Sequence, residues 1–225
     1  MSFKPKNENK WDKLYDPHKK TLFAKLEEKA ISWYFSKAFE KAILSVSNVK
    51  NGKIFEPGCG SGITTASFAK QGNEVTILDL SYNALRKALS VFNELSVGCK
   101  FALGDLFHIP FQDNQFDLVF NQGVMEHFKL AGLDPTLAIK EMLRVLKKNG
   151  TFVILVPAYF SPLYFVYCFF KLFRLIERFW PYEDQEFLHK NELYEMMQKG
   201  DCKNIVVKRL WSSLFFSMIG YCKKE

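Results

Sequence analysis

A loop with three closely spaced glycines occupies the stretch IFEPGCGSGITT, residues 54–65, between an apolar run and a helix-like segment. Gly58, Gly60 and Gly62 leave the backbone N–H groups of this loop open to a negatively charged or strongly polar ligand. The NAD fingerprint GxGxxG would need its third glycine at position 63, which is isoleucine. The loop therefore indicates a nucleotide-like ligand and argues against NAD.

Acidic residues accompany this loop and the ends of the next two predicted strands. Glu56 lies two residues before the first glycine, Asp79 ends the run VTILD, and Asp105 ends CKFALGD. Because the carboxyl ends of parallel strands meet at one edge of a sheet, these side chains should lie near the glycine loop. A carboxylate at the end of the second strand can accept hydrogen bonds from ribose hydroxyls, as in dinucleotide-binding folds.

The elements that position these residues alternate along the chain. The predicted strands cover residues 52–58, 73–81, 99–105, 116–123 and 151–157. The predicted helices cover residues 20–46, 63–72, 81–95, 135–150 and 189–200. This alternation predicts an α/β, Rossmann-like, doubly wound and mostly parallel sheet. Two further runs, 204–211 and 214–224, have no helix between them and predict a C-terminal antiparallel hairpin, which brings the sheet to seven strands.

The chain of 225 residues is expected to form a single domain. We divide it into a helical N-terminal arm (1–50), a cofactor-binding core (51–156), an aromatic helical insertion that acts as a lid (157–190), and a last helix with the terminal hairpin (191–225). The uncharged stretch 151–170 has the length of a membrane span, but Pro157 and Pro162 divide it. We therefore interpret it as a buried strand followed by a separate helix.

Charge and cysteine usage narrow the function classes. The formal net charge is +7, but no arginine-rich stripe interleaved with aromatic residues occurs, so nucleic acid is a disfavoured partner. The five cysteines form no CxxC pair, which favours free thiols in a reducing compartment. The polar N-terminus contains no signal peptide, so cytoplasmic localisation is expected. The pattern says nothing about oligomeric state.

Four segments in order resemble the motifs of class I S-adenosylmethionine-dependent methyltransferases of the small-molecule type, the methyltransferase-11-like group. They are the glycine loop with Glu56, VTILDLS with Asp79, LGDLFHIPF with Asp105, and FDLVFNQGVMEHF with Asn121. The terminal antiparallel hairpin is also typical of this family. The resemblance covers about residue 50 to 225 and implies S-adenosylmethionine as the cofactor.

The resemblance also implies roles for the residues at the polar end of the cofactor. The glycine loop would run beneath its methionine part, and Glu56 would hold the amino group. Asp79 would accept hydrogen bonds from both ribose hydroxyls, and Asp105 would receive the adenine amino group.

Four further positions follow from the same resemblance. Leu80 and Leu106 would pack on the adenine ring. Asn121 and Gln122 would lie where the fourth strand passes the sulfonium.

Methyl transfer from a sulfonium is an in-line displacement, so a general base is optional. For a hydroxyl acceptor, His127 is the first candidate base and Tyr15 the second. The other histidines are His18, His108 and His189. No pair of histidines has the spacing of metal ligands, and no metal is expected.

The acceptor is expected between the N-terminal arm and the aromatic insertion. The insertion contains a helix that is apolar nearly all round, with Lys171, Arg174 and Arg178 at its far end. We favour a lid over a small apolar or aromatic acceptor that is methylated on an O or N atom. A lipid-like acceptor captured at a membrane surface, with peripheral contact through residues 160–180, is the alternative.

Two other classes remain open. An RNA methyltransferase is less favoured, and the N-P-P-Y motif of adenine-modifying enzymes is absent because the chain reads NQGV at 121–124. A protein that binds the cofactor without turning it over is the last.

Overall fold

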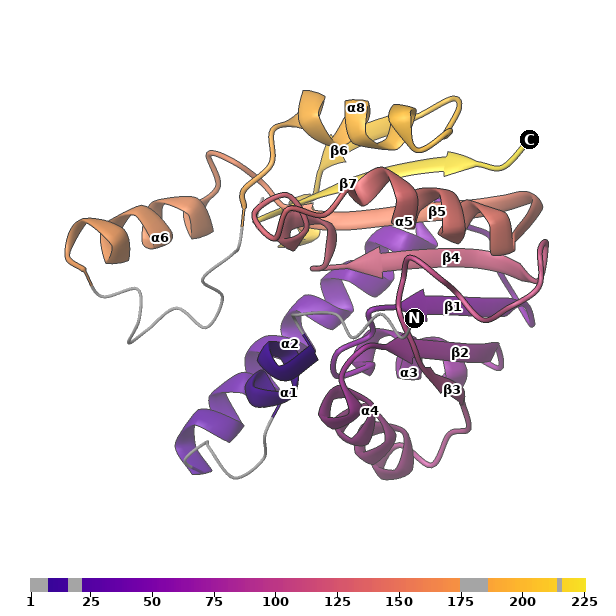
Figure 1. Cartoon of the computed structure of the whole chain (residues 1–225). Coiled ribbons are helices and arrows are strands. Elements are labelled where there is room, and N and C mark those ends of the chain that lie inside the picture. Colours follow the sequence, from indigo (N-terminus) through magenta and orange to yellow (C-terminus); the bar gives the residue numbers. More distant parts are fainter. Residues whose placement is uncertain (1–7, 16–21, 175–185, 214–215) are drawn as a thin grey trace.

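A seven-stranded sheet forms the centre of the computed structural model, which describes residues 8–15, 22–174, 186–213 and 216–225 (Figure 1). The strand order is β3-β2-β1-β4-β5-β7-β6. The strands are β1 Lys53–Pro57, β2 Glu74–Asp79, β3 Lys100–Leu103, β4 Phe116–Gln122, β5 Leu146–Pro157, β6 Val206–Arg209 and β7 Ser217–Lys223. Strands β1 to β5 pair in parallel, and β7 runs antiparallel to both of its neighbours. The predicted Rossmann-like fold with a terminal antiparallel hairpin is confirmed.

Helices cover both faces of this sheet. They are α1 Glu8–Leu14, α2 Leu22–Leu44, α3 Ile63–Lys70, α4 Tyr82–Glu94, α5 Pro135–Val145, α6 Pro162–Leu172 and α8 Lys190–Lys199, with short 3-10 turns η1 Met125–His127 and η2 Trp211–Ser213. Adjacent residues of a strand point to opposite faces, so Ile54 packs with α2, α3 and α4, whereas Phe55 packs with α5 and α8. Burial on both faces explains why the central strands are almost continuously apolar.

Local signals set several helix ends as expected. The Ser81 hydroxyl accepts a hydrogen bond from the backbone N–H of Ala84 and caps α4. Gly72, just beyond α3, has a left-handed backbone with φ of 85°. Serine before a helix and glycine after one are the residue types that favour these two conformations, and the ends agree with the predicted ranges 63–72 and 81–95.

The junction of α5 and β5 differs from the sequence prediction. Helix α5 ends at Val145 instead of continuing to residue 150, and Leu146 is already extended and paired with Phe116. The left-handed residue is Asn149, with φ of 61°, and its N–H donates to the Lys224 carbonyl. Pairing with strands distant in sequence overrides the helix propensity of the lysines. The prediction that this helix continues to residue 150 was therefore wrong.

The third strand is also shorter than predicted. Strand β3 ends at Leu103, so Asp105 lies in the turn that follows it. The N–H of Gly104 donates to the Asp79 carbonyl at 3.0 Å, which keeps this turn beside the end of β2. Asp105 therefore remains at the carboxyl edge of the sheet.

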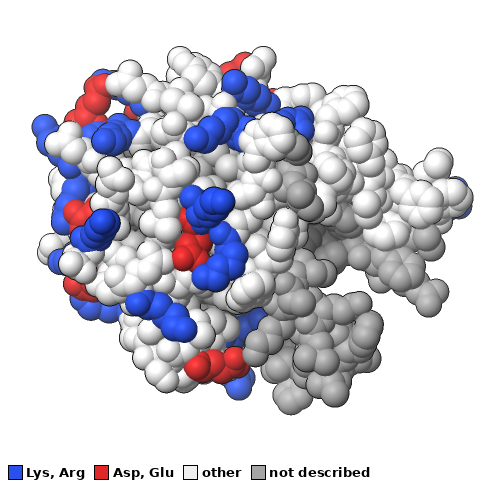
Figure 2. Space-filling view, turned by 180° about the vertical axis from the view of Figure 1, so that it is seen from behind, with Lys and Arg blue, Asp and Glu red and all other residues white. Residues whose placement is uncertain are grey.

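The uncharged stretch 151–170 divides between β5 and α6, as its two prolines predicted. Among the described helices, none combines the length and the hydropathy needed to cross a bilayer. Helix α6 projects away from the sheet (Figure 1), and seen from behind this projection is almost without charged residues (Figure 2). No side chain of α6 is buried.

Candidate functional site

The glycine loop lies at the carboxyl end of β1, where the strand order reverses between β1 and β4. All three of its glycines have a left-handed backbone, with φ of 70° at Gly58, 51° at Gly60 and 64° at Gly62. A Cβ atom at Gly58 would lie 2.7 Å from Cγ2 of Val124. Side chains are therefore excluded by both conformation and space, and the bare backbone stays open to a ligand.

Asp79 ends β2 directly beside this loop. Its Oδ2 accepts a hydrogen bond from the N–H of Gly60 at 2.9 Å, and its Oδ1 accepts one from the N–H of Ser81 at 2.9 Å. Burial raises the pKa of this carboxyl, and the backbone donors oppose that shift. The fold thus brings together the glycine loop and the acidic residue that the sequence paired with it.

Glu56 is fully buried beneath the same loop. Its Oε2 accepts a hydrogen bond from the Thr65 hydroxyl, whereas its Oε1 has no partner within the described part of the chain. Burial raises the pKa of Glu56 to about 8. An unpaired buried carboxyl oxygen is costly unless a ligand supplies the missing donor. This position fits the amino group of S-adenosylmethionine.

Asn121 and Gln122 end β4 on the other side of the loop. The Asn121 amide donates to the Pro57 carbonyl at 2.6 Å, and its Oδ1 has no partner among the residues described. The Gln122 Oε1 accepts a hydrogen bond from the Thr64 hydroxyl at 3.0 Å. Asn121 therefore presents a second unsatisfied buried acceptor at this edge.

The residues assigned to the adenine ring are arranged less uniformly. Asp105 is half-buried, and its Oδ1 accepts a hydrogen bond from the N–H of Phe107 at 3.0 Å, which caps its own turn. Leu80 is half-buried and follows Asp79 directly, but Leu106 is 6% exposed and packs in the core beside α5. The turn after β3 thus combines a polar residue at the edge with a leucine that anchors it.

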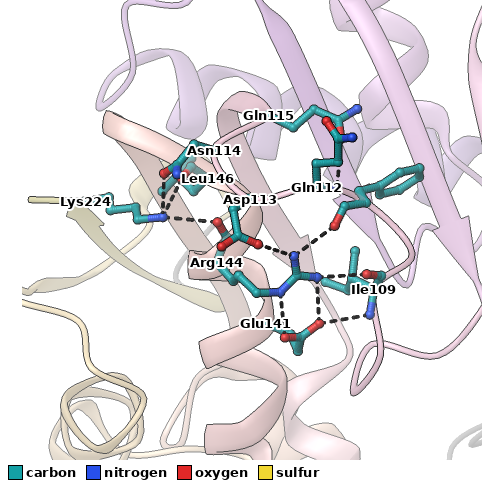
Figure 3. Close-up of polar contacts among 10 residues, drawn as sticks. Ile109, Gln112, Asp113, Asn114, Gln115, Glu141, Arg144, Leu146 and Lys224 are labelled. Atoms are coloured by element: carbon teal, nitrogen blue, oxygen red, sulfur yellow. Dashed lines mark hydrogen bonds and ion pairs between the residues drawn. The ribbon is translucent and has the colours of Figure 1, made fainter.

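Arg144 of α5 holds the loop that carries Asp105 (Figure 3). Its guanidinium donates to the carbonyl oxygens of Ile109 and Phe111, each at 2.9 Å. It also forms ion pairs with Asp113 at 2.7 Å and with Glu141 at 2.8 Å. Arg144 was not among the predicted site residues, because a single arginine on an amphipathic helix gives no sign of which loop it contacts.

Replacing Arg144 with methionine should lower the free energy of unfolding by about 3 kcal/mol, because two carbonyls and two carboxylates lose charge-assisted hydrogen bonds. Urea unfolding measures this loss. The matched control is Lys147→Met, which removes a single half-exposed ion pair with Asp117 and should cost less than about 1 kcal/mol. Equal losses in the two variants would contradict the role given to Arg144.

The N-terminal helix α1 lies against the same edge of the sheet. Asp12 accepts hydrogen bonds from the Ser81 hydroxyl at 2.6 Å and from the N–H of Asn83 at 3.2 Å. A Cβ atom at Gly60 would meet the Tyr15 hydroxyl at 2.5 Å. The candidate base Tyr15 therefore touches the glycine loop, and α1 covers part of the site.

The turn η1 places two polar side chains next to α1. His127 is 5% exposed, and its ring meets the Trp11 ring edge to face at a centroid distance of 5.0 Å. Glu126 is 1% exposed, its Oε2 has no partner in the described structure, and burial raises its pKa to about 8. The N–H of Glu186 donates to the Glu126 carbonyl at 3.2 Å, which joins the segment after α6 to this turn.

Glu126 was not among the predicted site residues. The only signal in the sequence is a Glu-His pair within the otherwise apolar turn VMEHF, and this signal does not show whether the glutamate is buried. The burial arises because β5, α1 and the segment before α8 converge on η1.

Three further histidines remain from the sequence. His108 is exposed, and the His189 ring lies 4.0 Å from the Tyr159 ring; His18 falls outside the described residues. No group of three metal-ligating side chains occurs in the part of the chain that the structure describes.

The strand order, with an antiparallel β7 inserted beside β5, defines a Rossmann-like methyltransferase fold. A family model of the methyltransferase domain matches residues 55–154. A demethylmenaquinone methyltransferase of Staphylococcus carnosus is 30% identical over 214 residues, which cover 87% of this chain and 86% of that protein. The chain belongs to the class I S-adenosylmethionine-dependent methyltransferases, and S-adenosylmethionine is its cofactor.

Two other similar proteins are consistent with this assignment. An uncharacterised methyltransferase of Schizosaccharomyces pombe is 34% identical over 110 residues, and the match spans 45% of this chain and 38% of that protein. The solved magnesium protoporphyrin IX methyltransferase of Synechocystis PCC 6803 with bound SAH has a TM-score of 0.66 and 13% identity, covering 96% of this chain and 94% of that one. The latter similarity concerns the fold.

Proposed function

We propose that this enzyme methylates an O or N atom of a small apolar or aromatic acceptor bound between α1 and the segment that follows β5. The observation that carries the proposal is the convergence of Trp11, η1 and Glu186 at the carboxyl edge. There the Trp11 ring lies against His127, and the Glu186 N–H donates to the Glu126 carbonyl, so an aromatic ring adjoins a turn with two polar side chains. The similarity to demethylmenaquinone methyltransferases supports an aromatic or quinone-like acceptor.

We further propose that the cofactor is held as the family resemblance implied. The unpaired Oε1 of Glu56 accepts a hydrogen bond from the amino group, and the glycine loop contacts the methionine part. Asp79 binds the ribose hydroxyls. Asp105, with Leu80 and Leu106, receives the adenine ring, and Asn121 and Gln122 border the sulfonium.

Bound S-adenosylmethionine would supply the methyl group from its positively charged sulfur, with S-adenosylhomocysteine as the leaving group. For a hydroxyl acceptor, His127 takes the proton as the new bond forms, and Tyr15 is the second candidate for this role. Glu126 remains protonated near neutral pH, since its pKa is about 8, and can donate a hydrogen bond to a polar atom of the acceptor. Contact with Trp11 keeps the His127 ring away from bulk water.

A methylation screen with labelled cofactor and a metabolite extract tests the acceptor directly. Label should appear in apolar aromatic compounds, and fragmentation of the product identifies the methylated atom. With a hydroxyl acceptor, His127→Gln should lower kcat about a hundredfold while leaving S-adenosylhomocysteine affinity unchanged. His189→Gln, which changes an exposed histidine, is the control. Transfer to RNA alone, or unchanged kcat in His127→Gln with a hydroxyl acceptor, would contradict the proposal.

An acceptor with a lipid-like tail is the second candidate, and one observation favours it. Helix α6 follows β5 at the same edge of the sheet and buries none of its apolar side chains. A long alkyl chain attached to the acceptor ring could be accommodated along such a surface. In the same screen, label in an organic-solvent extract of membranes separates this candidate from a water-soluble acceptor.

Cytoplasmic localisation stays a prediction.

A further inference from the structure

Helix α6 turns its most apolar side toward solvent. The exposed fractions are 55% for Phe165, 55% for Phe169, 76% for Leu172 and 56% for Phe173. These residues are spaced by four, three and one, so they follow one stripe of the helix. A stripe of large apolar side chains in water needs a partner that covers it.

The opposite side of α6 contacts the body of the protein through tyrosines. The Tyr164 ring meets the rings of Tyr159 and Phe187 at centroid distances of 4.4 and 5.5 Å, and the Tyr167 ring lies 5.3 Å from that of Phe187. The Tyr164 hydroxyl also hydrogen bonds to that of Tyr159. A helix that only packs on the protein core would bury its phenylalanines. In α6 the tyrosines face the protein body instead, and Phe165, Phe169 and Phe173 face solvent.

The beginning of α6 is anchored to the sheet. The Ser161 hydroxyl accepts a hydrogen bond from the N–H of Tyr164 and caps the helix. From β6, Arg209 donates to the carbonyl oxygens of Tyr159 and Phe160. These bonds fix the direction in which α6 projects (Figure 1).

Among the described residues, the charged side chains of α6 and of the two residues after it are positive. Lys171 and Arg174 are exposed at the carboxyl end of α6, and the helix itself contains no acidic residue. A helix of 11 residues is too short to cross a bilayer but long enough to lie in its interface. Aromatic side chains beside Lys and Arg match the boundary between acyl chains and anionic headgroups.

We propose that the stripe Phe165, Phe169, Leu172 and Phe173, together with Lys171 and Arg174, docks the enzyme on an anionic lipid bilayer. We call these six residues the α6 surface. The inference deepens the proposed function and rests on it for its purpose, because an acceptor dissolved in the bilayer would reach the site at the edge of the sheet from which α6 projects.

Flotation with vesicles tests the α6 surface without any methyl transfer. The parent protein should float with vesicles of phosphatidylcholine and phosphatidylglycerol. The variant Phe169→Ser/Leu172→Ser/Phe173→Ser should lose at least about tenfold in partitioning, since three large apolar side chains no longer enter the interface. Lys171→Glu/Arg174→Glu should bind these anionic vesicles only weakly. Its binding should equal that of the parent protein to vesicles of pure phosphatidylcholine at high salt.

Matched controls separate this surface from exposed apolar residues in general. Phe101→Ser/Leu130→Ser/Leu137→Ser changes three side chains that are 57%, 57% and 53% exposed elsewhere, and it should float like the parent. Calorimetry with S-adenosylhomocysteine should give parental affinity for all variants and thereby show that they are folded.

The outcomes distinguish the two proposals. If flotation depends on the α6 surface but no label appears in lipid acceptors, the docking surface is supported and the lipid-like acceptor is contradicted. A parent that does not float overturns the docking surface. If the parent protein is a dimer that does not float, and the serine variant is a monomer, then the stripe is an interface between two copies. This result would also overturn the docking surface.

Discussion

Replacing Asp79 with alanine should weaken the binding of S-adenosylhomocysteine by about a hundredfold or more. In the proposed site, two hydrogen bonds from ribose hydroxyls to the buried carboxylate would contribute about 1.5 to 3 kcal/mol each, and the variant would lose both. The loss also leaves the N–H groups of Gly60 and Ser81 without their acceptor, which loosens the glycine loop. Isothermal titration calorimetry measures the affinity.

Asp117→Ala provides the matched control for this loss. Asp117 accepts a hydrogen bond from the N–H of Lys53 at 2.8 Å, so it also joins a carboxylate to the backbone of a neighbouring strand, but at the amino end of β1. Its removal should lower stability while leaving the affinity for S-adenosylhomocysteine unchanged. Parental affinity in Asp79→Ala would show that the cofactor lies elsewhere.

The free energy of unfolding of the cofactor-free protein should fall as the pH rises from about 5 to about 8. Burial raises the pKa of Glu56 and Glu126 to about 8, whereas both glutamates ionise near pH 4.5 in the unfolded chain. Between these values the folded state holds a proton that the unfolded state has released. Stability is therefore greatest below the unfolded pKa and is lost as the pH rises toward the folded one, by about 1.4 kcal/mol per pH unit for each group.

Urea unfolding at several pH values measures this slope. Glu126→Gln removes one of these groups and should make the slope shallower, because the amide carries no titrating proton; Glu56 and Asp79, whose pKa values are also raised, keep contributing. The control is Glu141→Gln, since the ion pair with Arg144 lowers the pKa of Glu141 and leaves it ionised in both states over this range. A slope that is the same in Glu126→Gln as in the parent would mean that Glu126 is solvated or paired.

The sheet could be predicted because its signals are local. Apolar runs of strand length separated by helical periodicity gave the order of elements, and the glycines at 58, 60 and 62 marked the turn at the end of β1. The same pattern placed Asp79 at a strand end, because the apolar run stops there and the capping Ser81 follows it. Agreement of propensity, pattern and capping made these positions predictable.

Contacts between distant segments limited the prediction elsewhere. Helix α5 ends at Val145 because Leu146 pairs with Phe116, and this pairing is invisible in the local sequence. Arg144 and Glu126 were missed for the same reason, since their partners or their burial come from segments far away in the chain.

By itself, the sequence determined the α/β class, the glycine loop and the acidic strand ends, because backbone sterics and hydrophobic periodicity act over a few residues. Only the tertiary structure decided that Glu56 and Asn121 each keep an oxygen without a partner among the described residues, and that α1 reaches the glycine loop through Tyr15. It also decided that α6 turns its phenylalanines outward. Burial and orientation depend on which surfaces meet, and chain segments far apart in sequence supply those surfaces.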